Sequence, residues 1–169
     1  MATMPGSRPG CEMTTDSLAA ALELEHREID AGIEEFLTVR KQGGHQVEPL
    51  RRASAALRRH IFLEEEFVFP SLREAGLVAP IFVMLREHGE IWDTLDAIDA
   101  QLGREADAWT TSAICHLLLD QLKRHNDKEE PIVYSQIAVA LSEPAESKLR
   151  AFLDAGRMPP AWRCRQAGA

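Results

Sequence analysis

Two pairs of residues with the same spacing are candidates for metal binding. His60 precedes Glu64 by four residues, and His125 precedes Glu129 by the same interval. Residues four apart lie on one face of a helix, with about 5–6 Å between their Cβ atoms. Each pair can therefore direct an imidazole and a carboxylate at one point, a donor combination that suits iron, manganese or zinc.

Two further histidines, His26 and His88, interrupt stripes of apolar residues elsewhere in the chain. Burying four imidazoles and two carboxylates without partners would be costly, because one unpaired buried charge costs on the order of several kcal/mol. Divalent ions remove that cost. Two carboxylates can bridge two ions that each take two histidines, which leaves coordination positions open. We therefore predict a two-metal site with six ligands: His26, His60, Glu64, His88, His125 and Glu129.

The same polar pattern occurs twice along the chain. Residues 25–26 match residues 87–88 at an offset of 62, and the arginine, histidine and glutamate positions of residues 59–65 match those of residues 124–130 at an offset of 65. Two such helical hairpins packed together acquire an approximate two-fold axis, on which matching residues converge. The repeat favours one joint site over six unrelated polar residues.

Helical periodicity runs through most of the chain, and strand signals are nearly absent. Helices are predicted at about 15–41, 48–74, 80–102 and 111–141, followed by a short fifth helix that begins at Ser142 to Pro144 and ends at Gly156. Four amphipathic helices joined by short loops form an antiparallel up-and-down bundle. The fold is thus predicted to be all-α: a disordered tail at 1–14, a four-helix bundle at 15–141, and a short C-terminal helix with an irregular tail at 142–169.

Two histidines are excluded from the site. His45 lies beside two glycines in a loop, and His116 precedes His125 by nine residues, half a turn out of phase at ~100° per residue. The charged neighbours of the predicted ligands are expected to be solvated, as charged helix residues usually are. These neighbours are Glu65, Glu66 and Glu130.

For four other side chains, two interpretations remain open. Glu28 and Asp30 either lie behind His26 or face solvent. Trp92 either narrows ligand access or packs as a core aromatic. Tyr134 either approaches the site or covers the core.

Composition excludes several classes of protein. The net charge is −8, whereas nucleic-acid binding needs a basic face. No apolar run approaches the roughly 20 residues of a membrane span, so no membrane partner is expected. The three cysteines, Cys11, Cys115 and Cys164, are far apart and lack CxxC spacing, which predicts neither a disulfide framework nor a zinc ribbon. A reduced, cytoplasmic location is expected.

The chain resembles the hemerythrin-like HHE cation-binding domain family from about Leu18 to Leu141. The resemblance is carried by Glu25-His26, by His60-x-x-x-Glu64-Glu65 followed by Val68-Phe69-Pro70, by Glu87-His88, and by His125-x-x-x-Glu129-Glu130. It implies a four-helix bundle around a non-haem centre of two iron ions, bridged by oxo and carboxylate groups. Zinc or manganese remains open as the metal.

The chain departs from the oxygen carriers of that family at two positions. The carriers have a fifth histidine where this chain has Trp92, and they place the last carboxylate where this chain has Glu130. Glu129 is the better ligand here, as in the more symmetric members with four histidines and two glutamates. The iron-centre repair proteins of the family carry an additional N-terminal domain with paired cysteines, and this chain has only Cys11 there.

Two function classes follow. The first is a di-iron protein that binds dioxygen, nitric oxide or hydrogen peroxide in sensing, detoxification or iron handling. The second is a non-catalytic interaction module in which zinc or iron only stabilises the bundle. The sequence does not decide whether there is catalytic turnover.

Overall fold

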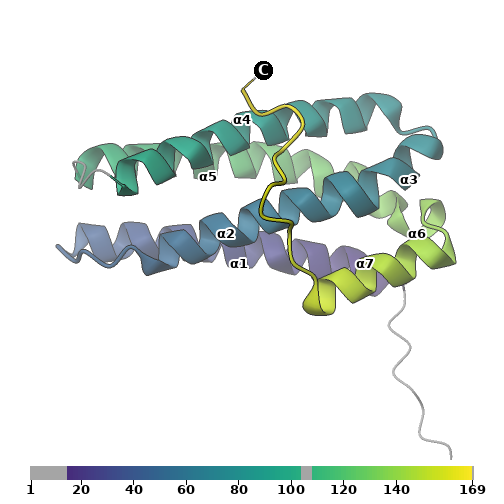
Figure 1. Cartoon of the computed structure of the whole chain (residues 1–169), viewed down its shortest axis with the longest axis horizontal. Coiled ribbons are helices and arrows are strands. Elements are labelled where there is room, and N and C mark those ends of the chain that lie inside the picture. Colours follow the sequence, from purple (N-terminus) through teal and green to yellow (C-terminus); the bar gives the residue numbers. More distant parts are fainter. Residues whose placement is uncertain (1–14, 104–107, 169) are drawn as a thin grey trace, which may run out of the picture.

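Four long helices form two antiparallel hairpins that pack against each other. The computed structural model describes residues 15–103 and 108–168, so the predicted tail at 1–14 lies outside the described residues. In Figure 1, helices α1 and α2 form one layer and α4 and α5 the other. Their bounds are Thr15–Lys41 for α1, Glu48–Leu63 for α2, Val78–Leu102 for α4 and Ala108–Ile132 for α5. The described residues contain no strand, and the predicted all-α bundle is confirmed.

Short turns end two of the helical segments where the sequence placed them, one between α1 and α2 and one before α4. Gly43 and Gly76 both adopt a positive φ, which residues without a Cβ reach at no steric cost. The last predicted helix is also present as α7, Glu143–Ala155, between Ser142 and Gly156. The chain then continues without regular helix to residue 168, as expected for the irregular tail.

The second predicted helix is not a single α-helix. After α2 comes a π-helical segment, Glu64–Val68, and only then α3, Phe69–Glu74. The Phe69 amide bonds the carbonyl of Glu64, five residues back. Pro70 has no amide hydrogen to continue an α-helical ladder, which fits the wider turn just before it. The expectation of an unbroken helix from 48 to 74 was therefore wrong at Glu64–Val68.

The fourth predicted helix also ends early. It stops at Ile132 and is followed by a 3₁₀ turn, Tyr134–Gln136, and the short α6, Ile137–Ala140. Pro131 lies inside the last turn of α5, where its ring crowds the carbonyl four residues back. The expected continuous helix from 111 to 141 was wrong for this reason.

Two apolar clusters fill the bundle, one at each end. One includes Leu22, Phe69 and Ile81, and the other includes Ile33, Leu57 and Leu118. The polar residues of the predicted site interrupt the same helices between these clusters. The bundle therefore has a polar layer with apolar packing on both sides.

Candidate metal centre

The six predicted ligands lie together inside the bundle. Their exposed fractions range from 0 to 5%. They form two groups of four in which potential donor atoms lie within 4.8 Å of one another, and both groups include Glu64 and Glu129. The first group is completed by His26 and His60, and the second by His88 and His125. This is the arrangement that two metal ions with two shared carboxylates require.

The two oxygens of Glu64 reach histidines of different groups. Oε1 lies 3.3 Å from Nε2 of His60, and Oε2 lies 3.2 Å from Nε2 of His88. Glu129 Oε2 lies 3.1 Å from Nε2 of His125 and 3.5 Å from Nε2 of His26. Each carboxylate thus stands between the two histidine pairs, in a position to bridge.

Several of these buried atoms have no hydrogen-bond partner among the described residues. They are Glu64 Oε2, His88 Nε2 and both carboxylate oxygens of Glu129. Glu64 Oε2, His88 Nε2 and Glu129 Oε2 do lie within 3.5 Å of an oppositely charged or ionisable partner, but these contacts are not hydrogen bonds. Buried polar groups are nearly always paired. Lone pairs left over at a shared point are what a bound cation would satisfy, so the donor set fits a metal pair.

Each imidazole also has a carboxylate behind it, on its Nδ1 side. The four pairs, with their Nδ1–oxygen distances, are His60 with Glu25 at 2.7 Å, His26 with Glu130 at 3.0 Å, His125 with Glu87 at 3.1 Å, and His88 with Glu65 at 3.2 Å. A proton held on Nδ1 leaves the Nε2 lone pair free for a metal, and such carboxylates raise the basicity of the ligand. The pairs obey the two-fold repeat.

The sequence predicted the positions of these acidic residues only in part. Glu66 is exposed as expected, but the expectation that Glu65 is solvated was wrong, since it is only 2% exposed. The π-helical segment contains Glu64 and Glu65 and buries both. Glu130 is about one-third exposed but still bonds His26. The signal in the sequence was the repeat itself, because residues 25 and 65 recur as residues 87 and 130.

Tyr134 reaches the first group. Its buried hydroxyl donates to Glu64 Oε1 at 2.5 Å and lies 3.1 Å from Nε2 of both His26 and His60. Phe69, its counterpart in the repeat, stacks on His88 instead. One half of the site therefore has a phenol and the other only a benzene ring.

The charges in the cluster are strongly coupled. Burial works against protonation of His60, but the Glu64 carboxylate and Glu25 outweigh it and raise its pKa to about 10. Burial also works against protonation of His125, but the Glu129 carboxylate outweighs the effect of burial and raises the pKa of His125 to about 10. Burial and the charge of His60 lower the pKa of His26 to about 4. The raised pKa values favour protonated His60 and His125 in the metal-free protein, and metal ions would compete with these protons.

The structure places the other candidate residues either outside the cluster, in the apolar core or beside the cluster. His45 and His116 are exposed and outside the cluster, as expected. Trp92 packs in the apolar cluster that includes Leu57, and is a core aromatic. Asp30 lines a small cavity beside the cluster, where burial and the Glu34 carboxylate raise its pKa to about 6.

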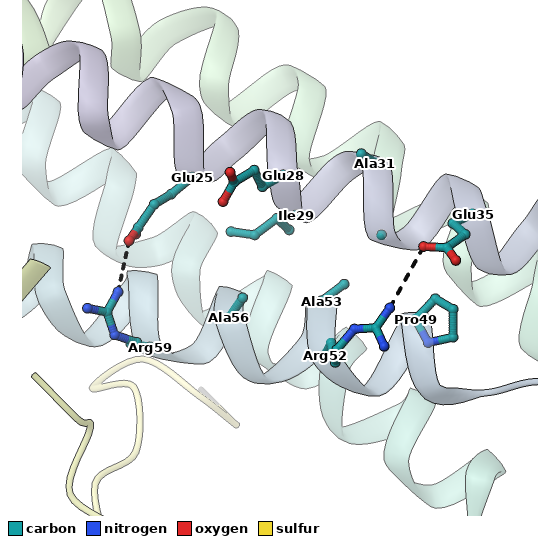
Figure 2. Close-up of a pocket in the computed structure, with 11 residues that line it drawn as sticks. Glu25, Glu28, Ile29, Ala31, Glu35, Pro49, Arg52, Ala53, Ala56 and Arg59 are labelled. Carbon is teal, nitrogen blue, oxygen red and sulfur yellow. Dashed lines mark hydrogen bonds and ion pairs between the residues drawn. The ribbon is translucent and has the colours of Figure 1, made fainter. Parts of the chain in front are cut away.

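A wider surface groove between α1 and α2 is not the site. Figure 2 shows its small lining residues and two ion pairs, Glu25 with Arg59 and Glu35 with Arg52. Glu28 lies on this groove and is exposed. The groove meets the histidine and glutamate cluster through Glu25, whose other oxygen accepts the His60 hydrogen bond.

Comparison with known protein families supports an assignment of this chain. The model of the hemerythrin HHE cation-binding domain matches residues 17–137, well over half of the chain. No curated protein and no solved structure matches at a significant level. No described helix is long and apolar enough to cross a membrane. With its bundle, its paired histidine and glutamate motifs and this match, the chain belongs to the hemerythrin HHE cation-binding domain family.

Proposed function

We propose that the protein holds two iron ions in this cluster and binds a small ligand there: dioxygen, nitric oxide or hydrogen peroxide. His26 and His60 would hold one ion, His88 and His125 the other, and Glu64 with Glu129 would bridge them. Iron supplies open coordination positions and a change of oxidation state. The observation that carries the proposal is the set of buried donor atoms without hydrogen-bond partners at the centre of the described bundle.

The residues around the cluster suit a small ligand and leave little room for a large one. The cavity beside the metal cluster is lined on its apolar side by Ile29, Leu57, Ile61, Ile91 and Leu122. Such a lining keeps water scarce around the ions. On the opposite side the Tyr134 hydroxyl donates to Glu64 and lies 3.1 Å from Nε2 of both His26 and His60, so it places a polar group beside the proposed ions. Sensing, detoxification and iron handling all begin with this binding step.

The test combines metal analysis with optical spectra of protein purified with iron. We expect iron in the protein, absorption in the near ultraviolet and visible, and a new spectrum after nitric oxide is added anaerobically. His116→Ala, at an exposed histidine outside the cluster, should give the same spectra. A colourless protein that binds only zinc, with its full d shell, would overturn the proposal and favour a structural metal.

A further inference from the structure

Two seams between helices, at matching positions in the internal repeat, lead from the surface to the proposed metal site. One runs between α1 and α5 and contains His26 with its partner Glu130. The other, here called the α2–α4 seam, runs between α4 and α2 with its π-helical continuation Glu64–Val68, and it contains His88 with its partner Glu65. The internal repeat would make the two seams alike. They are unequal, because the Glu130 side chain is 36% exposed whereas that of Glu65 is 0% exposed.

The C-terminal segment 157–168, here called the strap, covers the α2–α4 seam. Figure 1 shows it in yellow, passing over α2 and then α4. The Trp162 ring packs against Phe62 of α2 and Trp92 of α4, with centroid distances of 5.1 and 5.5 Å. Gly89 permits the close approach, because a Cβ there would lie 2.5 Å from the carbonyl oxygen of Gln166.

The strap also binds the carboxylate at the bottom of that seam. The Cys164 thiol donates to Glu65 Oε1 at 3.2 Å, and the Arg165 amide donates to Glu65 Oε2 at 3.4 Å. Glu65 in turn accepts the His88 hydrogen bond. Solvent is therefore excluded from His88 on this side.

The sequence repeat breaks where the two seams differ. At the offset of 62, Trp92 corresponds to Asp30 and Gly89 corresponds to Arg27; at the offset of 65, Ile61 corresponds to Asn126. The α2–α4 seam thus has apolar or small residues that receive the strap. The α1–α5 seam has polar residues at the same positions.

The α1–α5 seam is continuous with the site. Asp30 and Asn126 line the cavity beside the cluster and, with His26, also line a groove on the outer surface. Asp30 Oδ1 and Asn126 Oδ1 are buried and have no hydrogen-bond partner among the described residues. The groove is acidic overall, with two basic residues against five acids: Asp30, Glu34, Asp120, Asp127 and Glu130.

We propose that divalent cations enter the site through the α1–α5 seam, past the oxygens of Asp30 and Asn126, while the strap keeps the other seam closed. Acidic side chains at the mouth raise the local concentration of cations. The two unpaired oxygens then replace part of the ion's hydration before it reaches His26. This inference rests on the proposed two-metal site and adds a direction of entry to it.

The experiment measures uptake of cobalt(II) by the metal-free full-length protein, followed by stopped-flow absorbance. The double variant Asp30→Leu with Asn126→Ile makes the α1–α5 seam apolar, like its counterpart. We expect uptake to slow by about tenfold or more, with the same final number of ions per chain. Trp162→Ala, in the strap, should not reproduce this loss.

A second pair of variants avoids substitutions inside the bundle. Glu34→Lys with Asp127→Lys reverses two exposed charges at the mouth, and Glu74→Lys with Glu90→Lys makes the same net change on exposed residues elsewhere. The first pair should slow uptake several-fold at low salt and the second should not. Equal rates in both pairs, or an unchanged rate in the seam variant, would overturn the entry route. Failure of the wild-type protein to bind cobalt would instead overturn the metal site itself.

Discussion

The histidines of the candidate metal centre are oriented by acids that come from neighbouring helices. Glu25 of α1 accepts from His60 of α2, and Glu87 of α4 accepts from His125 of α5. Each acid fixes the ring orientation and the position of the proton. The strength of metal binding should therefore depend on residues that do not touch the metal.

Glu25→Gln tests this dependence. The amide keeps the size of the side chain but removes the charge that stabilises the Nδ1 proton of His60, so metal affinity should fall about 10–100-fold. Competition with a chromophoric chelator measures the change. Glu28→Gln, an exposed neighbour on the same helix, is the control. Equal affinities in the two variants would show that the Glu25 contact has no effect on the ions.

Tyr134→Phe tests the phenol of the first group. The hydroxyl donates to Glu64, and a hydrogen bond to a charged group contributes about 1.5–3 kcal/mol. With both ions bound, we expect the affinity of the Tyr134→Phe protein for nitric oxide to fall by about tenfold or more. We also expect its optical spectrum to shift. Replacing Phe69, the counterpart of Tyr134, by Leu should change the spectrum less. Identical titrations of wild type and Tyr134→Phe would place the hydroxyl outside the ligand pocket.

At the scale of elements, the close packing of α1 on α2 sets the position of His26 and Glu25 relative to His60. Gly32 is a point of close approach, since a Cβ there would lie 3.0 Å from the Cβ of Ala53. The small residues along the groove in Figure 2 allow the two helices to come together.

Gly32→Val should force these helices apart. Overpacking of this kind costs about 1–3 kcal/mol, which corresponds to a fall of several degrees in melting temperature for a domain of this size. Ala31→Val, at an exposed neighbouring position, should have little effect. Thermal unfolding followed by circular dichroism measures both. A Gly32→Val protein as stable as wild type would mean that the helix spacing is not set here.

The sequence predicted the elements that rest on local signals. The start and end of α1 and the end of α4 follow from apolar periodicity, and Gly43 and Gly76 end their helices. The sequence did not predict the π-helical turn at Glu64–Val68, because one extra residue in that turn does not change the four-residue spacing of His60 and Glu64. The burial of Glu65 was missed for the same reason. The strap was read only as irregular chain, since its contacts join residues far apart in sequence.

At the scale of the whole molecule, the two-fold repeat explains why the site could be found from sequence. Each hairpin alone offers only half of the donor set. The polar layer lies between two apolar clusters, so its charges must be satisfied locally. Protons do this in the metal-free protein and metal ions would do it in the loaded one.

The pH dependence of stability should therefore differ between the two forms. The folded-state pKa of His60 and His125, about 10, is above the ordinary value of 6.5. Their contribution is complete below about pH 6.5 and is lost as the pH rises towards 10. His26, with a pKa of about 4, acts oppositely and destabilises the fold as the pH falls from 6.5 to 4. The melting temperature of the metal-free protein should thus fall from pH 7 to pH 10, whereas that of the metal-loaded protein should not. A flat metal-free profile over that range would contradict the coupled charges.

The central claim is that six buried side chains hold two ions, and the most direct test is the number of metal ions bound per chain. Metal-free protein is titrated with iron(II) under anaerobic conditions, and bound metal is measured after removal of the excess. We expect two ions for the wild-type protein, and loss of the paired site for both Glu64→Ala and Glu129→Ala, since each removes a bridge. His45→Ala should still bind two. A wild-type plateau at one ion, or two ions bound equally well by Glu129→Ala, would contradict the paired site.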